Sequence, residues 1–501
     1  LEPDIHNLNY FASLNTSFSF KLLQGLTLKI AGGMNYSVDE SDDFYNSNTS
    51  YGTYTQGIGA KNNSVYIGLL NENTLNYSRP IGKYGKLDAV AGYSVQKAIS
   101  SYTGASNQNF AIQALGYNNL SLGTQFSAPS SSKEVSGIES YFGRVQYALF
   151  DKYLFTGTIR ADGSSKFPIH KWGYFPSGGI AWKVNEEKFM RGIQSISTLK
   201  FRFTYGHTGN ESIAPYSTYT SYGPTYYPAV QNNAIVVGVV PRQLGSTDLK
   251  WETNIQQNLG LDIGILHDRI FITTDAYTKK SKDLLLQAPL PGYSGFSAVT
   301  RNVGDMQVKG LEISLNTVNV NGKKFKWTTN FNISFNKSKV LNLNEGQEYF
   351  YTGSIGRYSD VYIVKVGQKL GAMFGYVYDG VINTQDELAT TVPHNSLNIR
   401  QGTRKYKDIS GPDGKPDGVV DDFDRTVIGN GNPQFFGGFS NNLSYRNLEF
   451  SFLFTYSYGN DVLNADKALF ESAEWYQGGK VDMLNRWTPS DPQINRQRWG
   501  H

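Results

Sequence analysis

The sequence contains no cysteine in 501 residues. This absence excludes a disulfide framework, a cysteine-based zinc cluster and a thiol nucleophile. The sequence also has no run of about 18 consecutive apolar residues, which a membrane-spanning helix would need, and its mean hydropathy is −0.40. A membrane-spanning β-barrel stays compatible with these values, because its strands need only one lipid-facing residue in two over ~10 residues.

Catalytic and nucleic-acid-binding patterns are missing as well. No G-x-S-x-G elbow and no G-x-x-x-x-G-K-[ST] phosphate loop occurs, and the neighbouring carboxylates Glu186 and Glu187 are best interpreted as a solvated pair beside a turn. No two histidines stand at the spacing of metal ligands; the six are His6, His170, His207, His267, His394 and His501. The net charge is +4, with lysines and arginines dispersed singly, so we expect neither an enzyme nor a nucleic-acid partner.

Aromatic and turn-forming residues are what the sequence has in excess. It contains 34 Tyr, 29 Phe and 7 Trp beside 52 Gly, while charged residues make up only 18%. This composition is typical of β-strands joined by turns. The length would allow three average domains, but all-β barrels often form one domain of this size.

Alternation of apolar and polar residues predicts the strands directly. In residues 327–336 one face carries Trp327, Phe331 and Ile333 while the other is built from amides and hydroxyls. The same pattern occurs in 74–78, 86–96, 141–149, 153–161, 258–265, 270–278, 310–318 and 448–458. About a dozen strands or slightly more are expected, joined alternately by turns of ~2–6 residues and by loops of ~20 or more.

This alternation of short and long connections favours an antiparallel barrel over a β-sandwich. The long segments 37–71, 216–245, 279–308 and 345–433 are predicted to be extracellular loops. One of them is rich in tyrosines, namely Tyr216, Tyr219, Tyr222, Tyr226 and Tyr227. Their rings could stack on a sugar or peptide, or could pack loop against loop; we favour the packing interpretation.

An acidic segment nearly matches a calcium-binding loop. Counting Asp413 as position 1 places Asp417 at 5, Gly418 at 6, Asp421 at 9 and Asp424 at 12, where hard oxygen ligands would converge around a glycine turn. Position 3 is Lys415, and position 12 is Asp rather than Glu. A structural calcium ion or another hard cation, and a plain acidic surface turn, both remain open.

Several longer motifs occur in a fixed order and carry a resemblance. They are Arg160–Phe167 (RADGSSKF), Tyr174–Trp182 (YFPSGGIAW), Leu199–Asn210 (LKFRFTYGHTGN), Leu249–Glu252 (LKWE), Asn302–Glu312 (NVGDMQVKGLE) and Gly375–Gly380 (GYVYDG). Together they resemble the barrel of the SusC/RagA group of TonB-dependent transporters, strongly over about residues 140–460.

The resemblance implies a transmembrane barrel of ~22 strands in the whole protein, of which residues 1–501 would supply over half. The plug, the TonB-contacting segment and the C-terminal strands are expected outside these residues. By resemblance the protein would lie in the bacterial outer membrane and import glycans or oligopeptides. Its partners would be a SusD-like surface lipoprotein, the TonB–ExbB–ExbD complex and outer-membrane lipid. A passive channel and a secreted β-sandwich adhesin or carbohydrate-binding protein are the alternatives, and no residue identifies the cargo.

Overall fold

The computed structural model describes residues 2–228, 235–343, 346–355 and 358–470, together with Val481 and residues 487–489. Its main element is a large antiparallel sheet with the strand order β1-β2-β3-β4-β6-β7-β9-β10-β13-β14-β17-β18-β25-β26, to which β5 and β8 add at β4 and β7. The all-β prediction is therefore confirmed. We call the strands of this order the wall strands.

The wall strands are long. Their bounds are β1 (Asp4–Leu23), β2 (Leu26–Tyr45), β3 (Ile58–Ile81), β4 (Gly85–Phe110), β6 (Ser130–Leu149), β7 (Tyr153–Ser164), β9 (Ser177–Lys183), β10 (Ile196–Asn210), β13 (Glu252–Ile265), β14 (Ile270–Lys282), β17 (Asp305–Asn321), β18 (Phe325–Asn342), β25 (Phe435–Tyr445) and β26 (Leu448–Tyr458). The added strands are β5 (Gly123–Phe126) and β8 (Trp172–Tyr174).

Shorter elements lie between the wall strands. Small sheets are formed by β11 (Ser221–Pro228) with β12 (Ile235–Gln243), by β15 (Leu285–Pro289) with β16 (Ala298–Asn302), by β19 (Tyr349–Ile355), β20 (Tyr358–Lys365), β21 (Ala372–Gly375) and β24 (Thr426–Asn430), and by β22 (Tyr378–Val381) with β23 (Arg404–Tyr406). The α-helices are α1 (Gln385–Thr390) and α2 (Ala465–Phe470); the 3-10 helices are η1 (Gly116–Leu122), η2 (Val184–Glu186), η3 (Lys188–Met190), η4 (Gly292–Ser294) and η5 (Asp422–Asp424). Within the described ranges, no helix is long and apolar enough to cross a lipid bilayer.

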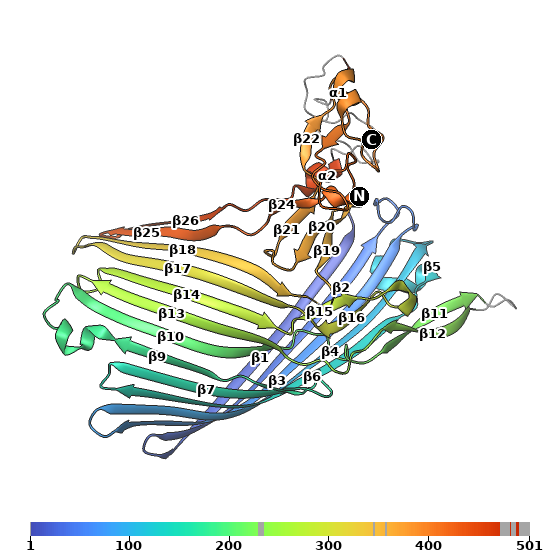
Figure 1. Ribbon diagram of the computed structural model, residues 1–501. Coiled ribbons are helices and arrows are strands. Elements are labelled where there is room, and N and C mark those ends of the chain that lie inside the picture. Colours follow the sequence, from blue (N-terminus) through green and yellow to red (C-terminus); the bar gives the residue numbers. More distant parts are fainter. Residues whose placement is uncertain are drawn as a thin grey trace. The chain divides into compact units, whose positions relative to one another are not determined.

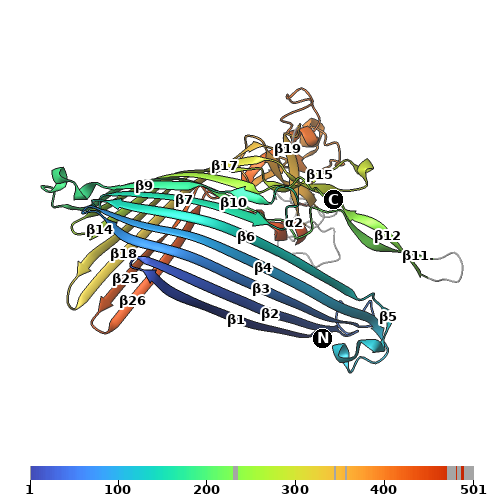
Figure 2. The same ribbon diagram turned by 90° about the horizontal axis from the view of Figure 1, so that it is seen from below.

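The chain divides into two compact units, which we describe separately. The first comprises residues 1–193, 200–259 and 281–303; in it β1, β2, β3, β4 and β6 lie side by side (Figures 1 and 2). Residues that stand opposite each other in an antiparallel pair point to the same face. One such row is Tyr36, Ile67, Ile99 and Val135, and the neighbouring row on the other face is Asn35, Gly68, Ala98 and Ser136. One face of this sheet is therefore apolar and the other is small or polar.

The second unit comprises residues 194–199, 260–280 and 304–501, and its strands β17, β18, β25 and β26 show the same division. Their apolar row is Leu315, Phe331, Phe439 and Phe454, and their polar row is Ser314, Asn332, Gly438 and Thr455. An apolar outer face with an amide- and hydroxyl-rich inner face is the pattern of a barrel wall between lipid and water.

The predicted loop 37–71 is wrong in its bounds, because most of it is strand. β2 continues to Tyr45 and β3 begins at Ile58, so only residues 46–57 form the connection. The backbone hydrogen bonds between β2 and β3 continue without interruption to Tyr45 and Ile58. They do not depend on apolar side chains, and most of the outward-facing residues in this part of the strands are polar. The other three predicted loops do join wall strands, and each contains a β-hairpin. In the predicted loop 279–308, residues 279–282 and 305–308 belong to β14 and β17.

Connections at the two ends of the wall strands differ. At one end are tight turns such as 24–25, 82–84 and 150–152, where Gly25 and Gly82 adopt the positive φ angles of 85° and 60° that favour glycine. At the other end are the segments that we call the long connections. These are residues 46–57, 111–129, 165–176, 211–251, 283–304 and 343–434.

One long-connection core is built from Phe167, Phe175, Leu249 and Trp251, with Ile213 and Leu285 packed against it. The Trp251 ring lies 5.6 Å from the rings of both Phe167 and Phe175. Its Nε1 donates a 2.8 Å hydrogen bond to the carbonyl of Lys171, so the polar edge of the buried indole is satisfied. This core joins the long connections 165–176 and 211–251 of the first unit, and Leu285 of the connection 283–304 packs against it.

Candidate functional site

The long connection 343–434 carries a cavity of 900 Å³. Its lining comes from β20, β21, β23, the segment 396–398, η5 and the residues that follow β26. A cavity of this volume is in the range of small-molecule binding sites. The side chains around it therefore form a candidate ligand-binding site.

A cation is fixed in the wall of this cavity. The Arg425 guanidinium lies 5.2 Å from the ring centroid of Tyr351 and 4.8 Å from that of Phe374, and the two rings are stacked 5.2 Å apart. Its Nη2 donates a 2.8 Å hydrogen bond to the backbone carbonyl of Asp360, which has an unusual positive φ of 62°. Ring contacts of this kind stabilise a guanidinium and restrict its movement.

Three further rings meet in the same segment. Tyr376, His394 and Tyr406 form a triangle with centroid distances of 5.2, 5.4 and 5.8 Å, and both tyrosines line the cavity. The Tyr376 hydroxyl donates to Asp422 Oδ1 at 3.2 Å. Burial, reinforced by the negative charge of Asp422, raises the pKa of Tyr376 to about 12, so the phenol stays protonated at neutral pH.

The third ring, His394, is held neutral. Burial lowers its pKa although Asp424, Asp422 and Asp421 act in the opposite direction. Its Nδ1 accepts a 3.1 Å hydrogen bond from the Ser396 backbone N–H, a role that requires an unprotonated nitrogen. The cavity thus presents ring surfaces, hydroxyls and a fixed cation, an arrangement for binding rather than for catalysis.

The four predicted cation ligands do not gather around a common point. Asp413, Asp417 and Asp421 each accept a backbone N–H two residues ahead, at 3.2, 3.1 and 2.9 Å. In the part of the chain that the structure describes, no three His, Cys, Asp or Glu side chains are placed to hold a metal ion. The geometry gives the calcium prediction no support, and it stays a prediction.

Asp424 has a different task, which the sequence did not reveal. It is fully buried, and its carboxylate accepts hydrogen bonds from the backbone N–H groups of Ile409 (2.6 Å), Ser410 (3.0 Å) and Asp421 (2.8 Å). Burial alone would raise the pKa of Asp424, but the three backbone donors and a hydrogen bond with Asp408 outweigh it and lower the pKa. A charged Asp424 therefore ties the acidic turn together through these hydrogen bonds.

The predicted tyrosine loop is more open than the packing interpretation implied. Tyr216, Tyr219 and Tyr222 are 52%, 52% and 66% exposed, so their rings are not packed in a loop core. Tyr226 and Tyr227 belong to β11, but their side chains lie outside the described residues. Tyr216, Tyr219 and Tyr222 are not among the residues that line the 900 Å³ cavity. Tyr376 and Tyr406, which do line it, were not predicted from the sequence as binding residues.

A second cavity, of 340 Å³, lies on the polar face of the first unit's sheet. Amides, hydroxyls and one carboxylate line it, from Asn15, Asn35, Tyr66, Gln96, Ser136 and Glu211. Gly68 is needed at its floor, because a Cβ there would lie 2.9 Å from the Tyr66 hydroxyl. Glu211 pairs with Lys166 at 3.4 Å. This cavity can hydrogen-bond a polar ligand along the inner face.

Comparisons with known proteins agree with this architecture. The family model described as "TonB dependent receptor-like, beta-barrel" matches residues 2–403. The chain belongs to this family. TonB-dependent receptor P3 of Formosa agariphila is 33% identical over 99% of the chain and 48% of the relative, and TonB-dependent receptor SusC of Bacteroides thetaiotaomicron is 31% identical over 64% of the chain and 31% of the relative.

A solved structure, that of the RagAB peptide transporter, superposes with a TM-score of 0.85 at 22% identity, over 100% of this chain and 53% of the other. At this identity the likeness shows the fold. The chain spans about half the length of the relatives it matches. Members of the TonB-dependent receptor family are outer-membrane proteins and not enzymes, so the predicted membrane, barrel fold and lack of catalysis are confirmed.

Proposed function

We propose that the whole protein actively imports an oligosaccharide or oligopeptide across the outer membrane, energised by TonB and assisted by a SusD-like surface lipoprotein. The observation that carries this proposal is the family match over residues 2–403. A relative named SusC and a structural neighbour titled a peptide transporter, RagAB, support the cargo classes and a two-protein assembly.

The described residues contribute the wall and a cargo surface to this function. Ring faces such as those of Tyr376 and Tyr406 bind the apolar faces of sugars or side chains, while hydroxyls and a fixed guanidinium supply directional contacts. Residues 1–501 contain no G-x-x-x-x-G-K-[ST] phosphate loop, so they offer no recognisable site for nucleotide hydrolysis. The energy source in the proposal is the TonB complex.

Uptake of fluorescently labelled oligosaccharides and oligopeptides tests the proposal in cells with and without functional TonB. We expect accumulation of one cargo class only when TonB functions. Equal uptake in both strains would reject active import in favour of a passive channel. Deleting the gene of the surface lipoprotein tests the partner in the same assay.

A variant pair then tests the cargo surface. Replacing Tyr376 and Tyr406 together by alanine should reduce accumulation at low cargo concentration by roughly tenfold, because stacked aromatic contacts are lost. The matched control is Tyr293→Ala, since Tyr293 is 93% exposed and is not among the residues that line the cavity. Equal uptake by the double variant and the control would remove the cavity from the proposal without affecting TonB dependence.

A further inference from the structure

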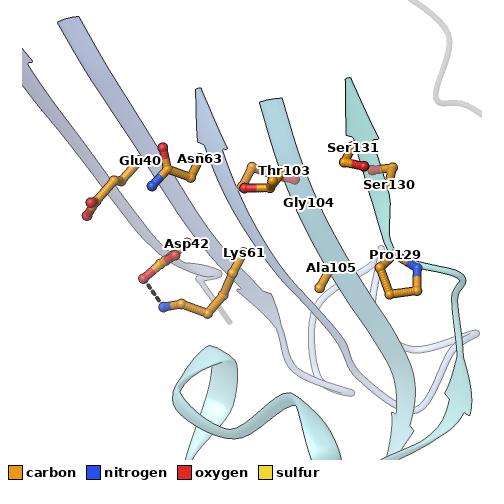
Figure 3. Close-up of a pocket in the computed structure, with 11 residues that line it drawn as sticks. Glu40, Asp42, Lys61, Asn63, Thr103, Gly104, Ala105, Pro129, Ser130 and Ser131 are labelled. Atoms are coloured by element: carbon orange, nitrogen blue, oxygen red, sulfur yellow. Dashed lines mark hydrogen bonds and ion pairs between the residues drawn. The ribbon is translucent and has the colours of Figure 1, made fainter. Parts of the chain in front are cut away.

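A third cavity, of 490 Å³, lies on the first unit's sheet, close to the ends of β2, β3, β4 and β6 (Figure 3). The strand register decides which face it occupies. Glu40, Asn63, Thr103 and Ser131 stand opposite one another in sequence across the four strands. They follow the apolar row of Tyr36, Ile67, Ile99 and Val135 at a spacing of four residues, an even number. The cavity therefore lies on the lipid-facing side of the wall and not in the lumen.

The polarity of this face changes in steps toward the cavity. The row after Tyr36 and Ile67 contains Val38, Val65, Ser101 and Lys133, and the next is the cavity row. With ~3.3 Å per residue, the cavity row lies on the order of 13 Å along the strands beyond the last fully apolar row. It is also at the end of the long connections, which in outer-membrane barrels face the cell exterior. This is the level of the outer-leaflet headgroups.

The long connection 111–129 lies beyond the far side of the cavity and contributes Pro129 to its lining. The helix η1 packs against β2, β3 and β4, and beside it Phe44 and Phe110 are buried in an edge-to-face contact of 5.2 Å. Lys61 Nζ lies 5.1 Å from the Tyr117 ring of η1 and pairs with Asp42, as Figure 3 shows. The cavity is therefore a notch between an apolar belt on one side and a folded connection on the other.

The side chains that line the notch include several hydrogen-bond acceptors. Asn63 Oδ1 is buried and has no hydrogen-bond partner among the described residues, and the Glu40 carboxylate lines the same space. Hydroxyls of Thr103 and Ser131 add to them, while the one cation, Lys61, is engaged by Asp42. Buried acceptors without donors are destabilising, and the lining carries one net negative charge. A ligand with several hydroxyl donors fits this chemistry better than a phosphate.

We propose that this notch binds the sugar headgroup of an outer-leaflet glycolipid. The site is continuous with the lipid-facing belt, so the acyl chains of such a lipid would run down the apolar rows while its hydroxyls reach Asn63 and Glu40. The proposal rests on the outer-membrane location of the family and is independent of which cargo is imported.

The test uses the full-length protein in nanodiscs that contain dephosphorylated rough lipopolysaccharide and phosphatidylglycerol, so that sugar hydroxyls rather than phosphates are offered to the notch. Retained lipid is measured by native mass spectrometry after mild detergent extraction. Asn63→Leu removes the orphan acceptor with little change of side-chain shape, so retention of lipopolysaccharide should fall at least tenfold while phosphatidylglycerol is unchanged. The control is Ser64→Leu, which places a leucine one residue along β3 on the opposite face. Thr103→Leu provides a second variant if Asn63→Leu does not assemble.

Two outcomes would overturn the proposal. Equal retention of lipopolysaccharide by Asn63→Leu, Thr103→Leu and Ser64→Leu would show that the notch makes no lipid contact. Displacement of the glycolipid by its free core oligosaccharide at equal concentration would assign the notch to soluble sugar instead, since a lipid site needs the acyl chains as well. Failure of TonB-dependent uptake would leave lipid retention unaffected, so the two proposals fail separately.

Discussion

The wall strands and the long connections are folded by different means. Every residue of β1 is exposed or half-buried on both faces, whereas Phe167, Leu249, Ile382 and Val420 in the long connections are almost completely buried. Away from the long connections the wall strands form no comparable apolar core, because their faces are made for lipid and for the water-filled interior. The connections form small cores, and these cores position the candidate sites.

Among the substitutions that test this difference between wall strands and long connections, we expect Phe167→Ala to have the largest effect. Phe167 is completely buried, and truncating a buried phenylalanine costs ~3–5 kcal/mol through lost transfer energy and the cavity left behind. We expect the connections 165–176 and 211–251 to lose hydrogen-exchange protection while β1 to β4 keep theirs. The control is Tyr54→Ala, at a residue that is 93% exposed. Loss of protection throughout the sheet would mean that wall and connections unfold as one.

Arginine substitutions on β17 test the two faces of the wall. Ile313 is paired with Ile333 in an apolar position and Ser314 with Asn332 in a polar one. Ile313→Arg should lower the free energy of unfolding by ~2–4 kcal/mol because it places a charge in lipid, and Ser314→Arg by much less. The free energies come from urea titration in lipid vesicles. Equal costs at the two neighbouring positions would contradict the lipid-facing assignment.

The difference between wall strands and long connections also explains which features could be predicted from the sequence. Period-two alternation predicted β26 with its bounds, 448–458, and the β17–β18 hairpin, because lipid on one side imposes a strict pattern. It identified neither β1 nor β2, and the predicted loop 37–71 included the end of β2 and much of β3. Toward the long connections the outward-facing residues become polar, as at Glu40 and Asn63, and the pattern weakens. The cavity around Arg425 was also missed. Its partners Tyr351 and Phe374 are 74 and 51 residues away in sequence, and no local spacing predicts such a contact.

A substitution at Asp424 tests how the long connection 343–434 is held together. Asp424→Asn removes the charge that holds three backbone N–H groups, and hydrogen bonds to charged groups contribute ~1.5–3 kcal/mol each before compensation. We expect faster proteolysis between Tyr406 and Thr426. Because the pKa of Asp424 is lowered from 3.8, its contribution is complete above that value and is lost as the pH falls through the folded-state pKa.

The predicted calcium ion is tested with the same protease assay. If backbone hydrogen bonds alone hold the acidic turn, treatment of the unmodified protein with a calcium chelator should leave the cleavage rate unchanged. A rate that rises on chelation and returns with millimolar calcium would restore the cation interpretation with its four predicted ligands, Asp413, Asp417, Asp421 and Asp424.

The smallest expected effect concerns His394, whose pKa is lowered from 6.5 because the ring is buried. The folded state therefore holds the neutral imidazole, and the unfolded chain binds the additional proton first as the pH falls. Stability from this ring is complete above 6.5 and declines as the pH falls below 6.5, until the folded-state pKa is passed. Protonation also removes the acceptor of the Ser396 N–H, so the protection factor of that amide should fall between pH 7.5 and pH 5.5.

The amides of β26, a strand without histidine, should keep their protection factors over this range. His394→Gln should remove the pH dependence at Ser396, because glutamine does not titrate. A pH dependence that persists in His394→Gln would assign the effect to the surrounding carboxylates, and one shared with β26 would show that the connection does not respond on its own.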